Sequence, residues 1–220
     1  MARLLALFVT AFVDMIGLTM IVPLLPYYAT EFGASATMVG ILVAAFSLAQ
    51  LIVAPAWGRL SDRYGRRPAI LAGLLLSGAA YAIFAVAGSV ELLLLSRIVQ
   101  GLGGGTIGVV QAYVADASPP DQRTKSLGWL SAVTSLGAVA GPAFGSVMIS
   151  LGGRTAPGLG AAILSLLVAA FAWRFLKESR GLRLSGAHAA TTTGVAAIRR
   201  VLSHWHEPAP RLIWIYTVGI

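Results

Sequence analysis

The sequence predicts an all-α membrane protein built around a bundle of six transmembrane helices. Of its 220 residues, 57% are hydrophobic and only 11% are charged, whereas about a quarter of the residues of soluble proteins are charged. The mean hydropathy is +0.82. The apolar residues form long runs, and most of the charged residues lie between those runs. This pattern excludes a soluble fold, a disordered chain and a nucleic-acid-binding arm, despite the net charge of +8.

Six apolar runs are long enough to cross a bilayer, which takes about 20 residues in a helix. They cover residues 4–28, 37–58, 68–88, 91–115, 126–150 and 156–176. The first run carries Asp14 and two prolines and leads directly into the second, so we interpret it as a helix and not as a cleaved signal peptide.

Polar residues set the boundaries between the runs. The arginine-rich segment 59–67 separates the second run from the third, and Pro68 suits the first turn of the third helix. Segment 116–125 separates the fourth run from the fifth. Two glycines followed by Arg154 separate the fifth run from the sixth.

The Lys and Arg residues predict the orientation of the bundle. If the N-terminus is cytoplasmic, Arg154 is the only one of the 16 Lys and Arg residues in an outer loop, and Arg97 is the only one inside a span. Basic residues concentrate in cytoplasmic loops. We therefore expect a multi-pass protein of the cell (plasma or inner) membrane. Aromatic residues near span ends, namely Tyr27, Tyr28 and Trp57, are expected at the membrane–water interface.

The composition changes after the sixth run. Residues 177–210 are polar, basic and interrupted by Gly and Pro, which predicts a cytoplasmic connector after the bundle of residues 1–176. Residues 211–220 begin another apolar run that reaches only about half of the ~30 Å hydrocarbon core. We interpret this run as the first half of a seventh helix in a truncated chain.

Asp14 and Arg97 are the two charged residues that lie well inside the predicted spans. A charge at the centre of a membrane helix costs at least about 2.5–3.5 kcal/mol, so each needs a reason to be there. Each lies on the first helix of a three-helix set, and transporter halves are often inverted three-helix repeats with the site between them. We expect the two side chains to lie near each other in a cavity. The alternative is an ion pair that only joins helices.

Polar residues on the second and fourth spans extend this candidate cavity. One stripe of the fourth helix holds Arg97, Gln100, Gly101, Gly104, Gly108 and Gln111. A polar, glycine-rich stripe is typical of a cavity wall, although close helix packing also explains glycines. Gln50 is a further cavity candidate, for which an interhelical hydrogen bond is the alternative role.

The charged segments suggest a cytoplasmic cluster. Asp62 lies among the arginines of segment 59–67, and Gly65 permits a tight reversal of the chain there. Asp116 follows the fourth span on the same side of the membrane. We expect Asp62, Arg66 and Asp116 to hold the inner ends of the second and fourth helices together in one conformation.

The fifth span carries Gly137, Gly141, Pro142 and Gly145. The glycines lie on nearly one face, which permits close packing against a neighbouring helix. Pro142 removes a backbone hydrogen bond and is expected to bend the helix.

Together these segments resemble the major facilitator superfamily and, more narrowly, its twelve-helix drug:proton antiporters and tetracycline exporters. The resemblance covers residues 4–178 and implies the N-terminal six-helix half of that fold, with a second six-helix half expected in the same chain. It also implies roles for three groups of residues. These are a gating motif of Gly58, Asp62, Gly65, Arg66, Arg67 and Asp116, proton coupling through Asp14 and Arg97, and an antiporter motif of Gly137, Gly141, Pro142 and Gly145.

Two positions depart from the pattern of these exporters. Ser146 replaces a glycine of the antiporter motif, which is a mild change. Ala80 stands where tetracycline exporters carry an acid that they need for their drug, which argues against tetracycline as the substrate.

The function that the resemblance implies is export of drugs or other small amphipathic molecules by proton antiport with alternating access. The expected partners are a small-molecule substrate, protons and the lipid bilayer, with a proton gradient as energy source and no cofactor, metal or nucleic acid. A sugar or metabolite transporter of the same fold and an inactive half-transporter remain alternatives. An enzyme is not expected, because no predicted span contains a histidine or two carboxylates well inside it.

Overall fold

The computed structural model describes residues 2–176, and the predicted connector and seventh helix lie outside the described residues. The described elements are all helical. They are α1 (Ala2–Ile21), α2 (Leu24–Glu31), α3 (Ala36–Tyr64), α4 (Arg66–Ala85), α5 (Val90–Gly103), α6 (Thr106–Ala117), η1 (Pro120–Gln122), α7 (Arg123–Gly152), η2 (Gly153–Thr155) and α8 (Ala156–Phe175).

Each predicted span corresponds to one helix or to two consecutive helices. The first span is α1 with α2, the fourth is α5 with α6, and the others are α3, α4, α7 and α8. By length and composition, five apolar helical stretches of the described chain could cross a membrane. The last of them, Pro120–Phe175, contains both α7 and α8, which the short η2 turn joins. The fold class predicted from the sequence is thereby confirmed.

Two spans are broken where the sequence predicted continuous helices. The first span is interrupted between Ile21 and Leu24, where Pro23 lacks the N–H that a helix interior needs. The fourth is interrupted between Gly103 and Thr106, within a run of three glycines, the residue after proline that least favours a helix. Broken spans place backbone polar groups at membrane depth, as transporters do around their sites.

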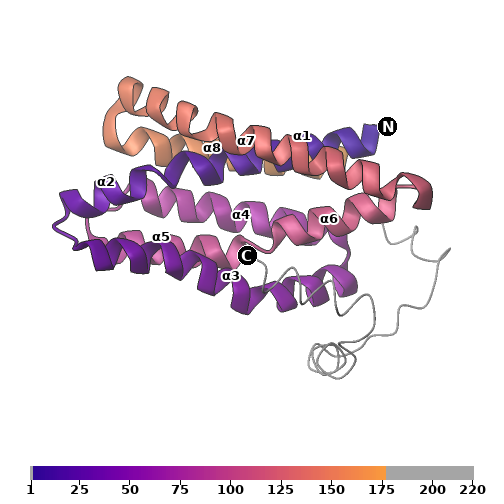
Figure 1. The fold of residues 1–220 in the computed structure, drawn as a ribbon, viewed down its shortest axis with the longest axis horizontal. Helices are drawn as coiled ribbons and strands as arrows, with labels where there is room; N and C mark the ends of the chain where they lie inside the picture. Colours follow the sequence, from indigo (N-terminus) through magenta and orange to yellow (C-terminus); the bar gives the residue numbers. More distant parts are fainter. Residues whose placement is uncertain (1, 177–220) are drawn as a thin grey trace, which may run out of the picture. The chain divides into compact units, whose positions relative to one another are not determined.

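The helices form two sides with α4 between them (Figure 1). α1 packs against α7 and α8 on one side, α3 packs against α5 on the other, and α4 contacts both α8 and α5. Two apolar clusters fill the interior. One includes Leu7, Ile70 and Val114, near the end where α3 meets α4, and the other includes Ile21 and Phe84, near the opposite end.

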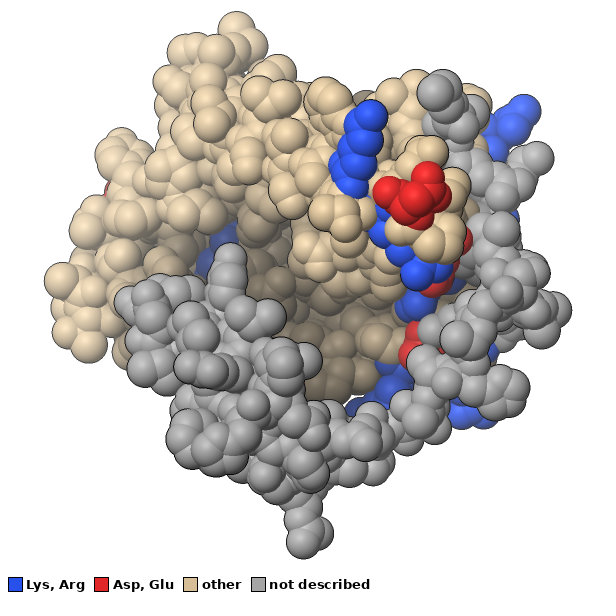
Figure 2. Space-filling view, turned by 45° about the vertical axis from the view of Figure 1, so that its right-hand side comes forward, with Lys and Arg blue, Asp and Glu red and all other residues tan. Residues whose placement is uncertain are grey.

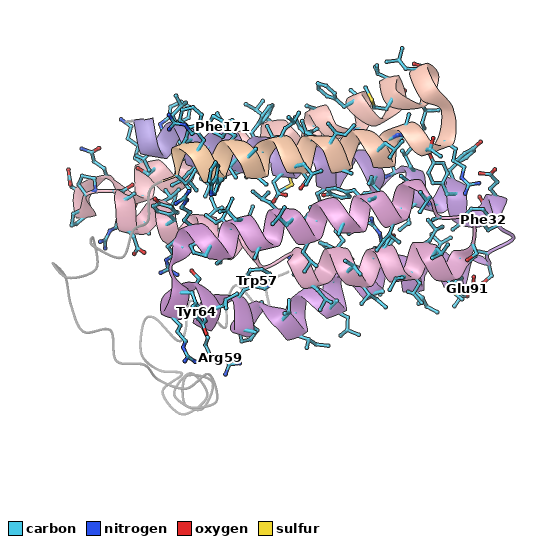
Figure 3. The ribbon with its side chains drawn as sticks, turned by 180° about the vertical axis from the view of Figure 1, so that it is seen from behind. Phe32, Trp57, Arg59, Tyr64, Glu91 and Phe171 are labelled. Atoms are coloured by element: carbon cyan, nitrogen blue, oxygen red, sulfur yellow. The ribbon has the colours of Figure 1, made fainter. Side chains whose placement is uncertain are left out.

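Most of the charged residues of the described chain lie toward the end of the bundle that holds the α3–α4 and α6–α7 connections. Figure 3 places Phe32 and Glu91 at one end of the described bundle and Arg59 and Tyr64 toward the other. In Figure 2, blue and red side chains gather toward one side, and most of the other visible described surface carries none.

The α3–α4 connection is shorter than predicted. Helix α3 continues through Tyr64, so Gly65 alone separates it from α4, whereas the sequence indicated a loop over 59–67. Gly65 has φ +109° and ψ 162°, a conformation that side-chain-bearing residues rarely adopt. One glycine therefore makes the whole reversal.

The outward faces of α3 and α7 are strongly apolar. Leu51 is 71% exposed on α3, and Val139 is 77% exposed on α7. Tyr27 is also exposed, as an interface residue would be, but Tyr28 and Trp57 are buried. Both of these side chains donate hydrogen bonds within the bundle, Tyr28 to the Arg154 carbonyl and Trp57 to the Leu102 carbonyl.

Candidate functional site

A polar cavity of about 140 Å³ lies within the bundle and includes Asp14 of α1. Its other polar lining residues come from α3, α4, α5 and α6, and are Gln50, Ser77, Tyr81, Gln100 and Thr106. Met15, Leu18, Phe46 and Ile107 supply apolar wall. None of the ion pairs among the described residues includes Asp14. The cavity therefore presents one carboxyl group among neutral hydrogen-bonding side chains.

Arg97 is almost completely buried beside this cavity, with 2% of its surface exposed. Its guanidinium carbon lies 5.6 Å from the ring centre of Phe84, a cation–π distance. The expected proximity to Asp14 does not take the form of an ion pair in the described residues. Instead, Tyr81 of α4 lies within electrostatic range of both Asp14 and Arg97. Tyr81 was not predicted from the sequence, where only its place in the middle of an apolar span distinguishes it.

Gln100 is also 2% exposed, and neither polar atom of its side chain has a hydrogen-bond partner among the described residues. The Nε and Nη2 atoms of Arg97 also have no hydrogen-bond partner among the described residues. Leaving a buried polar group unpaired costs about 1–3 kcal/mol. Since native proteins rarely accept this cost without a reason, both side chains are candidates for contact with a ligand or with water.

The break in the fourth span divides the predicted polar stripe. Arg97, Gln100 and Gly101 are buried on α5, whereas Gly108 and Gln111 are exposed on α6. Gln111 does not line the central cavity.

Side chains satisfy three successive carbonyl groups at this break. Trp57 Nε1 donates to the Leu102 carbonyl (2.6 Å), Thr106 Oγ1 donates to the Gly103 carbonyl (2.8 Å), and Gln50 Nε2 donates to the Gly104 carbonyl (2.7 Å). Trp57 lies between α3 and the fourth span in Figure 3. These bonds matter because hydrocarbon offers no partner for a freed backbone group.

The expected cytoplasmic cluster is assembled around Arg66, which is 8% exposed. Arg66 Nη1 donates to Asp62 Oδ1 at 3.0 Å and to Ser61 Oγ at 2.8 Å, and Nε donates to Asp116 Oδ2 at 3.0 Å. The guanidinium group of α4 thereby joins the ends of α3 and α6.

The other predicted members of the gating motif lie around this cluster. Arg67 donates to the Trp173 carbonyl, which connects the start of α4 to the end of α8. Gly58 lines a larger cavity of about 680 Å³ between α3 and α6, which extends from Gln50 to Asp62 and Arg66.

The glycines of α7 pack directly on the backbone of α1. A Cβ atom at each of the three positions would lie within 3 Å of an α1 carbonyl oxygen. The distances are 2.6 Å from Gly137 to Phe12, 2.9 Å from Gly141 to Ile16, and 2.7 Å from Gly145 to Met20. Pro142 is exposed and lies inside the continuous α7. The glycine face therefore positions α1, the helix that carries Asp14.

An apolar helical bundle with two broken spans and polar side chains in a central cavity is typical of a multi-pass membrane transporter. The sequence model of the Major Facilitator Superfamily matches residues 7–220. The chain belongs to this superfamily, and this membership points to a transporter rather than an enzyme. In the described part of the chain, no group of three His, Cys, Asp or Glu residues could hold a metal ion.

Two relatives of the chain are drug-resistance proteins. The chain is 33% identical to the quinolone resistance protein NorA of Staphylococcus aureus over 153 residues, 69% of this chain and 39% of that protein. It is 36% identical to the class B tetracycline resistance protein of Escherichia coli over 178 residues, 78% of this chain and 44% of that protein. The chain thus spans about half the length of the curated relatives it matches.

A solved structure shares the fold. The crystal structure of the human organic anion transporter MFSD10 (TETRAN) matches with a TM-score of 0.71 and 27% sequence identity. The match covers 89% of this chain and 52% of that protein.

Proposed function

We propose that this chain forms the N-terminal half of an exporter that moves drugs or other small amphipathic molecules outward in exchange for protons. The drug-resistance names of two relatives support this substrate class. In the proposed arrangement, the N-terminus and residues 177–210 are cytoplasmic, and a second six-helix half of the same chain completes the transport path. The proton gradient is the energy source, without a cofactor.

The observation that carries the proposal is the carboxyl group of Asp14 in the central cavity, which has no ion partner among the described residues. A carboxyl group in such a place can exchange a proton for a cationic or polar substrate, because gaining or losing the charge changes what the cavity binds. Tyr81 lies within electrostatic range of both Asp14 and Arg97, so it senses this change of charge.

The Arg66 cluster supplies the second element of alternating access. It joins the ends of α3, α4 and α6 through two carboxylates. Asp62 lies on α3, the helix directly before Arg66, whereas Asp116 lies on the more distant α6. Separation of the Arg66–Asp116 pair would free the end of α6 from α4. We infer that this pair is closed in one access state and open in the other.

The test uses inverted membrane vesicles that carry the complete protein and a fluorescent cationic dye. Imposing a pH gradient should drive dye uptake by the wild type, and Asp14→Asn should abolish that uptake. Asp121→Asn is the matched control, because Asp121 is an exposed carboxylate of η1 outside the cavity, and it should transport normally. Full pH-driven uptake by Asp14→Asn would refute the proton role.

A further inference from the structure

Two cavities meet on opposite sides of one side chain, that of Gln50. The central cavity of about 140 Å³ contains Asp14. The larger cavity of about 680 Å³ runs between α3 and α6 toward Asp62 and Arg66. Both are lined by Gln50, Gly104 and Ile107, which therefore form the wall between them.

The wall is closed by a hydrogen bond from the side-chain amide of Gln50 to the carbonyl oxygen of Gly104, 2.7 Å long. Gly104 lies in the break between α5 and α6, where the helical hydrogen-bond pattern is interrupted. A Cβ atom at Gly104 would lie 3.0 Å from Cδ and Nε2 of Gln50. The amide therefore lies directly against the backbone, with no space for even a methyl group between them.

The groups that face the central cavity can hold hydrogen-bonded water. Its volume of about 140 Å³ corresponds to four or five water molecules at about 30 Å³ each. Asp14 faces it from α1, Tyr81 from α4 and Gln100 from α5, while Arg97 of α5 lies within electrostatic range of Tyr81. A proton released by Asp14 can move through such water, and Gln50 lies between this water and the larger cavity.

We propose that Gln50 is the barrier on the proton path between Asp14 and the cavity that leads to the Asp62–Arg66 cluster. The inference rests on the proposed proton antiport and names the element that prevents protons from leaking without substrate. The barrier is suited to opening, because interhelical hydrogen bonds within a membrane are individually weak and water in the two cavities would bond the freed Gly104 carbonyl. Rotation of the Gln50 side chain away from Gly104 would join the two cavities without any backbone movement.

The experiment measures proton leakage into liposomes that contain the complete protein and a pH-sensitive dye, with no substrate present. Gln50→Ala removes the barrier and should raise the leak about threefold to about eighteenfold, the range spanned by single hydrogen bonds inside membranes. Gln50→Met keeps the volume but not the donor, and should also leak, which provides a test if the alanine variant folds poorly. Ser47→Ala is the matched control, because Ser47 lines only the larger cavity, and it should remain tight.

A second substitution separates a specific path from general damage. Adding Asp14→Asn to Gln50→Ala should return the leak to the wild-type level, because the path starts at Asp14. Wild-type tightness of both Gln50 variants would overturn the inference, as would a leak that persists in the double variant. The proposed function is tested separately, by pH-driven dye uptake of the wild type. That uptake can be absent while Gln50→Ala still leaks protons, and it can be present while Gln50→Ala does not leak.

Discussion

The packing of α7 on α1 gives a quantitative prediction for Gly137→Ala. The new Cβ atom would lie 2.6 Å from the Phe12 carbonyl oxygen and 3.0 Å from the Met15 Cβ atom. Neither of these atoms can rotate away, since one belongs to the backbone and the other is fixed to it. Carbon–oxygen contacts of this kind are normally about 3.3–3.6 Å long, so the helices must separate by at least about 0.7 Å.

Such overpacking costs about 1–3 kcal/mol, against a gain of about 1 kcal/mol from replacing a helical glycine by alanine. We expect a net loss of up to about 2 kcal/mol, measured as a lower melting temperature of the complete protein in detergent. Gly128→Ala, on the same helix, is the control because nothing lies within 4 Å of its Cβ position, and it should melt at or above the wild-type temperature.

Transport should follow the same pattern, because Phe12 lies two residues before Asp14 on α1. Gly137→Ala should reduce pH-driven dye uptake, and Gly128→Ala should not. If Gly137→Ala matches Gly128→Ala in both melting temperature and uptake, the inference that the glycine face positions α1 is wrong.

Three other substitutions test the break, the reversal and the cluster. Trp57→Phe removes the donor to the Leu102 carbonyl and should lower stability by about 1–3 kcal/mol, seen as a lower melting temperature; an unchanged value would show that the bond contributes nothing. Gly65→Ala places a side chain at φ +109° and should cost about 1–3 kcal/mol, whereas a wild-type melting temperature would mean that the reversal relaxes freely. Arg66→Lys replaces the planar guanidinium group, which bonds two carboxylates at once, by a single ammonium group. It should slow dye uptake in vesicles as strongly as Asp116→Asn does. Wild-type uptake by both variants would argue against a gating role for the Arg66–Asp116 pair.

The sequence was sufficient to predict the spans because the bilayer imposes a length and a composition on each of them. All six predicted runs correspond to helices or to pairs of helices. The cluster of Asp62, Arg66 and Asp116 was also predictable, since charged residues at span ends on one side of a membrane are confined to a thin layer.

The sequence did not predict that the fourth span is broken, or which side chains donate hydrogen bonds to the backbone carbonyl groups at the break. Three consecutive glycines lower helix propensity, but whether a helix opens there depends on donors from another helix, here Gln50 and Trp57. Beyond the break, Gln111 is exposed and does not line the central cavity. The burial of Trp57 was also not predictable, because position along a span does not indicate which face is buried.

The predicted neighbourhood of Asp14 and Arg97 was incomplete for a related reason. Helical periodicity gives the face of each helix, but it does not say which third helix lies between two charged residues. Tyr81 of α4 lies within electrostatic range of both charged residues, and only the packing of α4 between the two sides of the bundle brings it there.

The most direct test of proton antiport measures protons released when substrate binds to the purified complete protein in weakly buffered detergent solution. If Asp14 exchanges its proton for substrate, adding a cationic dye should release protons from the wild type and none from Asp14→Asn. Equal proton release from both proteins, at dye concentrations that saturate both, would contradict the central role given to Asp14.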